Sequence, residues 1–407
     1  MRRLTGLCAA FLLSCSAPSL YAQERPTLAL TVDVSHVAKD KWRVEYRFSQ
    51  PVTAVKLPAV GDYRQRAWKM LTPGMRLGTE AEDDVISSAG KPFKMAIVEI
   101  TTFDGLAPKH YAPFNRFTDG GTAIFLGHLH GDAYRRKQAL TMSADIRLKG
   151  LQQETVIPPP LNKLVPGGER GYAYFGPARA VLADTTLVLI DPDTPAWARE
   201  TLLDVSAKMS RYYEKAYQRP LNDKLFIMLS VAGFEAPGLS MKGGAVLGQL
   251  SYRFDGKEVP GDHPKKREYF ARLIAHEMAH IWQTNIERGG IGADNPWVHE
   301  GGAEAMALDG LLQTGTSTPE QIGAYRAAQS ATCEKLGNSV DSYDGIYACG
   351  LVRFDKLGVG IVPLWRSMMR ATEAKGAVYS PQMIDAIVIG QRAVRGEAGT
   401  MNPGSGG

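Results

Sequence analysis

The sequence predicts an α+β fold, with a β-sheet half followed by a largely helical half. Apolar and polar side chains alternate from Lys41 to Phe48, which is the pattern of a strand with one buried face. The runs Pro158–Pro160 and Pro166–Gly168 continue neither a strand nor a helix, so they indicate a boundary. From about Lys266 onward the apolar residues follow a helical period. Strands first and helices afterwards are typical of the α+β class.

The first half, residues 26–157, is predicted to be a β-sandwich domain. Several strand patterns follow one another there without a long helical period between them. The clearest further patterns are Thr27–Val34, Lys94–Thr101, Thr122–Leu126 and Leu140–Leu148. His128 and His130 are expected to alternate along a strand and so to share one face, and we assign them no role.

The second half, residues 169–395, is predicted to be a separate domain that begins with a small sheet. Its predicted elements are strands at Tyr172–Phe175, Thr186–Ile190 and Lys224–Val231 and a helix at Pro195–Tyr217. A later helix start is clear, with Thr318 as N-cap and Pro319 as the first helical residue. Residues 396–407 are predicted to be a disordered tail.

The N-terminal segment has the features of an export signal. A positive start at Arg2 precedes the apolar stretch Leu4–Leu13, and small residues follow up to Ala22. This pattern predicts a signal peptide over residues 1–22 and a periplasmic or secreted protein. The alternative is lipid attachment at Cys15.

The rest of the chain bears on partners and redox state. The net charge of +5 comes without a dense cluster of Lys and Arg, so nucleic acid is not an expected partner. No later segment is apolar enough to cross a bilayer. Signal cleavage leaves two cysteines, Cys333 and Cys349. They either form a disulfide that closes a short loop or remain buried thiols, because sequence alone does not give their separation.

Residues 276–280, His-Glu-Met-Ala-His, form an HExxH motif within a helical pattern. Positions i and i+4 lie on one face of a helix, so His276 and His280 can bind one metal ion. Two imidazoles and a carboxylate suit zinc, and a catalytic site leaves a position for water. Glu277 then lies beside that water. The alternative is a surface helix with two solvated histidines.

A second acidic segment, Trp297 to Glu304, follows the motif after a glycine-rich stretch that lets the chain turn back. Glu300 is expected in the first turn of a new helix, as the third metal ligand. Glu304 is one turn further and can hold the outer nitrogen of a ligand histidine. An ordinary acidic helix start is the alternative. His299 is not expected as a fourth ligand, because adjacent helical residues point about 100° apart.

The segments HEMAHIW and WVHEGGAEA resemble the gluzincin zinc metallopeptidases, in particular the aminopeptidase N-like and glycyl aminopeptidase-like branches. The resemblance covers residues 270–310. It implies a β domain followed by a thermolysin-like zincin domain, one Zn²⁺ per chain, and Glu300 as the third ligand. Residues 281–299 separate the second histidine from Glu300, one residue more than is usual in the family.

The resemblance also implies the chemistry, which is hydrolysis of a peptide or protein substrate. Zinc activates a water molecule, and Glu277 takes its proton and later passes it to the leaving amine. The family carries a tyrosine that donates a hydrogen bond to the oxyanion. Tyr347 fits this position best and Tyr343 is the alternative, while either one can also be a core tyrosine.

Substrate recognition departs from the family pattern. The aminopeptidase N-like enzymes use a G-x-M-E-N segment to bind the substrate's amine, and this chain lacks it. Gly243, Gly244 and Ala245 are predicted to form the corresponding edge strand, which pairs with the substrate backbone. They supply no carboxylate, so aminopeptidase specificity does not follow. The alternative function is an inactive envelope binding protein on a metallopeptidase scaffold.

Overall fold

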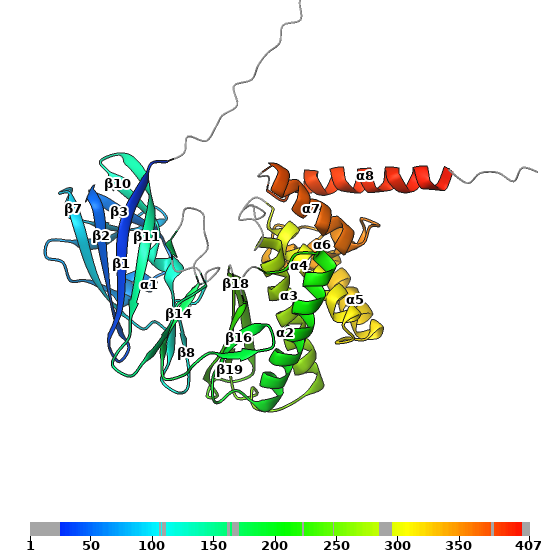
Figure 1. Ribbon diagram of the computed structural model, residues 1–407, viewed down its shortest axis with the longest axis horizontal. Coiled ribbons are helices and arrows are strands. Elements are labelled where there is room, and N and C mark those ends of the chain that lie inside the picture. The colour runs from blue at the N-terminus through cyan, green and yellow to red at the C-terminus, as the bar shows by residue number, and fades with distance from the viewer. Residues whose placement is uncertain are drawn as a thin grey trace, which may run out of the picture.

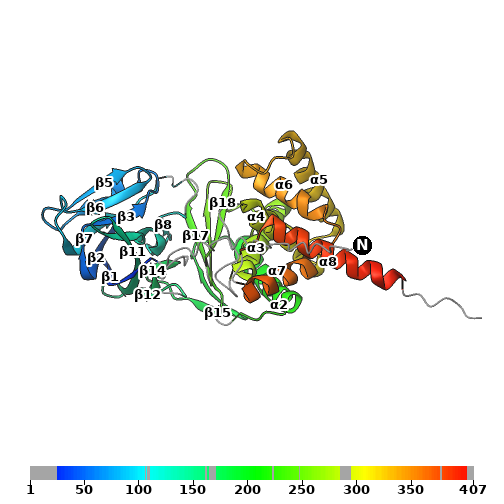
Figure 2. The ribbon, with the colours of Figure 1, turned by 90° about the horizontal axis from the view of Figure 1, so that it is seen from above.

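The structure is a computed structural model that describes residues 25–105, 107, 111–160, 163–164, 171–221, 224–246, 248–284, 295–375 and 378–400. The predicted signal peptide and Cys15 lie outside these residues. Both overall views show a β-rich N-terminal half, a central sheet and a helical C-terminal half (Figure 1, Figure 2). The α+β prediction is therefore confirmed.

The largest sheet has the order β4-β7-β2-β1-β11-β10-β3-β6-β5, and β13 also pairs with β11. Its strands are β1 Thr27–Ala38, β2 Lys41–Val52, β3 Ala54–Pro58, β4 Trp68–Met70, β5 Arg76–Glu80, β6 Asp83–Ser87, β7 Phe93–Thr101, β10 Asp132–Arg135, β11 Gln138–Lys149 and β13 Lys163–Leu164, with the short helix α1 at Tyr63–Ala67. The alternation predicted for residues 41–48 is confirmed, because Trp42, Val44 and Tyr46 are fully buried.

A smaller sheet, in the order β12-β14-β9-β8, packs against the large one. Its strands are β8 Phe114–Arg116, β9 Thr122–Phe125, β12 Thr155–Ile157 and β14 Tyr172–Gly176. Both sheets contribute to one apolar core, as expected for a sandwich. The segment Tyr172–Phe175, which the sequence assigns to the second domain, instead lies in β14 and pairs with β9 and β12. The run Pro158–Pro160 therefore follows one strand of this sheet, β12, and precedes another, β14.

The expected strand through His128 and His130 is wrong. β9 ends at Phe125, and a 3₁₀ turn, η1 Leu126–Leu129, follows it. His128 is buried there, between the rings of Phe125 and Tyr63. The two histidines therefore do not share a strand face.

The central sheet has the order β15-β16-β17-β19-β18, with β16, β17 and β19 parallel and β18 antiparallel at the edge. Its strands are β15 Val181–Ala183, β16 Thr186–Ile190, β17 Phe226–Gly233, β18 Ser240–Val246 and β19 Gln249–Asp255. Helix α2, Ala196–Tyr217, connects β16 to its parallel neighbour β17. Its buried face includes Trp197, Leu202 and Met209, and it joins the core beneath the sheet.

The remaining helices are α3 Pro264–Thr284, α4 Pro296–Gln313, α5 Pro319–Lys335, α6 Tyr343–Asp355, α7 Ile361–Lys375 and α8 Pro381–Thr400. The start of α5 is as predicted, and the Thr318 side chain also forms a capping box with Gln321. The expected tail is wrong for residues 396–400, which continue α8, while residues 401–407 lie outside the described part. None of the described helices is long and apolar enough to span a bilayer.

Two buried polar side chains join the small sheet to the central sheet. Gln249 accepts a hydrogen bond from the Tyr172 backbone N–H at 2.6 Å and donates one to its carbonyl at 3.0 Å. Asp191 accepts from the backbone N–H groups of Thr118, at 2.9 Å, and Val231, at 3.0 Å. These bonds fix the β-sandwich against the sheet that borders the site described below.

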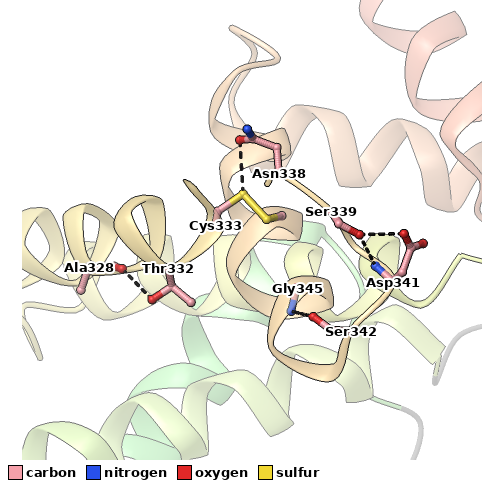
Figure 3. Close-up of a disulfide and its surroundings, with 9 residues drawn as sticks. Ala328, Thr332, Cys333, Asn338, Ser339, Asp341, Ser342 and Gly345 are labelled. Atoms are coloured by element: carbon pink, nitrogen blue, oxygen red, sulfur yellow. Dashed lines mark hydrogen bonds between the residues drawn. A yellow bond between two sulfur atoms is a disulfide. The ribbon is translucent and has the colours of Figure 1, made fainter. Parts of the chain in front are cut away.

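The structure resolves the alternatives for the two cysteines, because Cys333 and Cys349 form a disulfide (Figure 3). The bond joins α5 to α6, and both cysteines are buried. The double variant Cys333→Ser/Cys349→Ser should lower the free energy of unfolding by about 3 kcal/mol, as the loop length predicts. Urea unfolding of both proteins measures this. A variant as stable as the wild type would show that the disulfide adds nothing to the fold.

Candidate metal centre

Helix α3 presents both histidines of the HExxH motif on one face. The Nε2 atoms of His276 and His280 lie 3.1 Å apart. Behind them, Ile274, Ala275, Met278 and Ala279 are buried in the core under the central sheet. These apolar residues, which precede His276 or lie between the two histidines, thus anchor the helix and turn both imidazoles to the same side.

Helix α4 adds the carboxylate. Glu300 Oε2 lies 3.1 Å from His276 Nε2 and 3.3 Å from His280 Nε2. Glu300 is in the second turn of α4, not the first as expected, because the helix already begins at Pro296. The predicted connecting loop, residues 285–294, lies outside the described residues.

These three atoms fit a zinc ion. Zinc with ligands at about 2.0–2.1 Å in tetrahedral geometry separates its ligand atoms by about 3.3 Å. The separations here are 3.1, 3.1 and 3.3 Å. Among the described residues, His276, His280 and Glu300 form the group of histidine, cysteine and acidic side chains suited to a metal. His299 is not part of it, as expected.

Hydrogen bonds behind the site orient His280. Its Nδ1–H donates to Gln283 Oε1 at 2.7 Å, and the Gln283 amide donates to the backbone carbonyl of His299 at 3.0 Å. Gln283 therefore fixes the ring and ties α3 to α4. Gln283 was not predicted as a site residue, although its position three residues after His280 places it on the same helix face.

Glu304 plays the corresponding part at His276. His276 Nδ1 lies 3.0 Å from Glu304 Oε1, an ion-pair distance without hydrogen-bond alignment. Glu304 also accepts hydrogen bonds from the Tyr325 hydroxyl at 2.9 Å and from Arg272 at 3.3 Å. The acidic residue expected beside His276 is thus in place. Tyr325 was missed because the contact with α5 is set by tertiary packing, whereas Arg272 lies on α3 itself, one turn before His276.

Opposite charges stabilise each other in this site, which favours a carboxylate with protonated histidines. Burial would lower the pKa of His276, but its contacts with Glu300 and Glu304 raise the pKa well above its usual value. Burial would likewise raise the pKa of Glu300, but His280 and His276 hold it far below its usual range. Zinc must replace the protons on the imidazoles, so the site should bind metal more weakly as the pH falls.

Glu277 lies between α3 and the edge strand β18. It is buried, and desolvation raises the pKa of its carboxyl group, while His276 and His280 oppose the shift. A Cβ added to Gly243 would lie 3.0 Å from the Glu277 Cγ atom and 3.1 Å from Oε1. An added side chain would therefore press on Glu277, and glycine leaves this carboxylate room against the strand. A raised pKa is what a general base working near neutral pH requires.

The two candidate tyrosines on α6 are in different surroundings. The Tyr347 ring lies 5.7 Å from the His276 ring, between centroids. Burial, with the charge of Glu300, raises the pKa of Tyr347 far above its usual range, so the hydroxyl stays a donor. Tyr343 is 71% exposed and packs against the outer side of Tyr347 at 5.1 Å. The geometry therefore favours Tyr347 for the donor role.

A close crossing of α4 and α6 positions Tyr347. A Cβ on Gly301 would lie 2.4 Å from the Gly350 carbonyl carbon, and one on Gly350 would lie 2.9 Å from the Gly301 Cα. Both glycines are needed for the helices to touch at this point. Gly301 follows Glu300 directly, and Gly350 is one turn after Tyr347, so the crossing links the carboxylate of the candidate metal centre to Tyr347.

Gly301→Ala should therefore push α6 away and displace Tyr347. We expect a loss of about 1–3 kcal/mol in the free energy of unfolding. For the peptide hydrolysis that the sequence resemblance implies, we expect at least about a tenfold loss of rate, since small misplacements of catalytic groups are costly. Gly323→Ala on α5 is the matched control, because an added Cβ there meets nothing within 4 Å. Equal stability and activity of the two variants would show that the crossing is not needed.

No protein-family model and no curated protein matches the sequence. Solved structures do match. An aminopeptidase N family protein from Idiomarina loihiensis has a TM-score of 0.55 and 10% identity, over 85% of this chain and 70% of that one. The M1 zinc metallopeptidase from Deinococcus radiodurans has a TM-score of 0.50 and 14% identity, over 92% of both chains.

LTA4 hydrolase from yeast has a TM-score of 0.50 and 12% identity, over 89% of this chain but only 64% of its own length. The chain therefore has the fold of the M1 zinc metallopeptidases, which is the gluzincin architecture expected from HEMAHIW and WVHEGGAEA. Identities of 10–14% show the fold alone. The activity rests on the site itself.

Proposed function

We propose that this protein is a zinc-dependent peptidase, with one zinc held by His276, His280 and Glu300. The triangle of ligand atoms at zinc-like separations carries this proposal. Bound zinc would supply a Lewis acid that activates water at neutral pH. The fold of the M1 zinc metallopeptidases supports peptide-bond hydrolysis as the reaction.

The chain's own residues have distinct roles in this reaction. Glu277 accepts the proton of the attacking water and returns it to the leaving amine. The Tyr347 hydroxyl donates a hydrogen bond to the oxyanion that forms at the substrate carbonyl. Gln283 and Glu304 orient the two imidazoles. The edge strand β18, at Gly243 to Ala245, binds the substrate backbone.

The N-terminal segment supports an exported protein, periplasmic or secreted after cleavage at Ala22, with lipid attachment at Cys15 as the alternative form. The disulfide between Cys333 and Cys349 suits such an oxidising compartment. Mass spectrometry of the mature N-terminus distinguishes the two forms.

Digestion of a peptide library, with products identified by mass spectrometry, tests the activity. We expect cleavage that stops with a zinc chelator and returns when zinc is restored. Products lacking single N-terminal residues would establish an aminopeptidase, and internal cuts an endopeptidase. If the zinc-loaded protein cleaves nothing in the library but still binds peptides, it is a binding protein on a peptidase fold.

A further inference from the structure

The edge strand β18 has one side that faces β19 and one that pairs with no other described strand. Val246 and Gln249 are the last residue pair of the β18–β19 hairpin, and two residues, 247 and 248, separate them. In such a turn the closing pair is hydrogen-bonded, and hydrogen-bonded pairs alternate along the ladder. The backbone N–H and C=O groups of Gly244 therefore point to β19. Those of Gly243 and Ala245 point to the open side, which is the edge of β18 away from β19.

The two faces of β18 are covered by different parts of the chain. Gly243 lies against Glu277 on the side of α3. Gly244, whose Cα faces the other way, lies against Tyr111, and a Cβ there would be 2.9 Å from the tyrosine Cε1. Tyr111 belongs to the β-sandwich half and precedes β8, and its ring packs on Phe125 of β9 at 4.6 Å. The β-sandwich thus reaches the strand beside the general base.

Tyr111 also forms a hydrogen bond with this strand. Its hydroxyl donates to the Ala245 backbone carbonyl at 2.6 Å. That carbonyl is one of the open-side groups that would pair with a substrate backbone. The next open-side residue along the strand, Gly243, is the one in contact with Glu277. The hydrogen bond from Tyr111 therefore lies at the open-side residue next to Gly243, the one in contact with the proposed general base Glu277.

We propose that Tyr111 is a specificity-determining residue that limits how far a peptide pairs along β18. This inference rests on the proposed peptidase function. In one direction from Gly243, a substrate meets Met241 as the next open-side residue. In the other direction it meets the Ala245 carbonyl, which already accepts a hydrogen bond from the Tyr111 hydroxyl, so the substrate must compete with Tyr111 for this group. The β-sandwich domain thereby shortens the substrate site on one side of the cleaved bond.

Two nested peptide series test the proposal. Both share one cleaved bond, and they extend residue by residue, one towards the N-terminus and the other towards the C-terminus. For the wild type, kcat/KM should stop rising in one series at the length that reaches Ala245. For Tyr111→Phe, kcat/KM in that series should rise by a further factor of about 3–10, which corresponds to the free energy of one backbone hydrogen bond. The ratio of kcat/KM for the longer to the shorter peptide is the readout.

Tyr46→Phe is the matched control. It removes a tyrosine hydroxyl that donates to a backbone carbonyl, that of Leu129, within the β-sandwich. Its length dependence should equal that of the wild type. If the wild type cleaves peptides and Tyr111→Phe shows the same length dependence, the role of Tyr111 is refuted and the peptidase function stands. If the zinc-loaded wild type cleaves no peptide, the proposed function fails and this inference with it.

Discussion

Replacing Glu277 with glutamine is expected to remove nearly all peptide hydrolysis while the protein keeps its metal. The glutamine amide has the size of the carboxylate but accepts no proton from water. General-base catalysis contributes about 10²–10⁴ in rate, so kcat should fall by about that factor. The ligand atoms come from His276, His280 and Glu300, so zinc content should not change. Initial rates and metal analysis on one preparation measure both effects.

The control for this variant is Glu268→Gln, which makes the same chemical change on the exposed part of α3. We expect wild-type activity from it. If Glu277→Gln retains more than about a tenth of the wild-type kcat, its loss is smaller than general-base catalysis contributes. Glu277 would then not be the base.

Tyr347→Phe is expected to have the second largest effect on activity. The variant keeps the ring packing against His276 and loses the hydroxyl. Removal of one donor to an oxyanion costs about 10²–10³ in kcat. Because the interaction forms in the transition state, KM should change little. Steady-state kinetics separate the two parameters.

Tyr343→Phe is the matched comparison, because it removes a hydroxyl one turn earlier on the same helix, at a residue that is 71% exposed. Its kcat should stay within a factor of about two of wild type, an effect below 0.5 kcal/mol. The assignment of the donor to Tyr347 is refuted if Tyr343→Phe loses more activity than Tyr347→Phe.

The sequence predicted features that depend on local periodicity. Spacing of two residues identified the buried face of β2, and spacing of four residues placed His276 and His280 together, with Glu304 one turn after Glu300. These patterns are encoded within single elements. The HExxH segment also indicated the fold, which the structural comparisons confirm.

Other features depend on contacts between distant segments, which one sequence does not reveal. Tyr111 reaches Ala245 across 134 positions, and Tyr325 reaches Glu304 from a different helix. The strand Tyr172–Gly176 joins the first half of the chain because its partner β9 lies there. The disulfide likewise required the distance between α5 and α6, which spacing alone left open.

The zinc content of the purified mature protein, measured beside that of Glu300→Ala, decides whether the two histidines and Glu300 bind a zinc ion. Glu300 Oε2 completes the triangle with the two imidazoles, and two histidines alone form a much weaker site. We expect about one zinc per wild-type chain and little or none in the variant after the same dialysis. A wild type that takes up no zinc even after reconstitution, or a variant that retains it fully, would refute zinc binding by His276, His280 and Glu300.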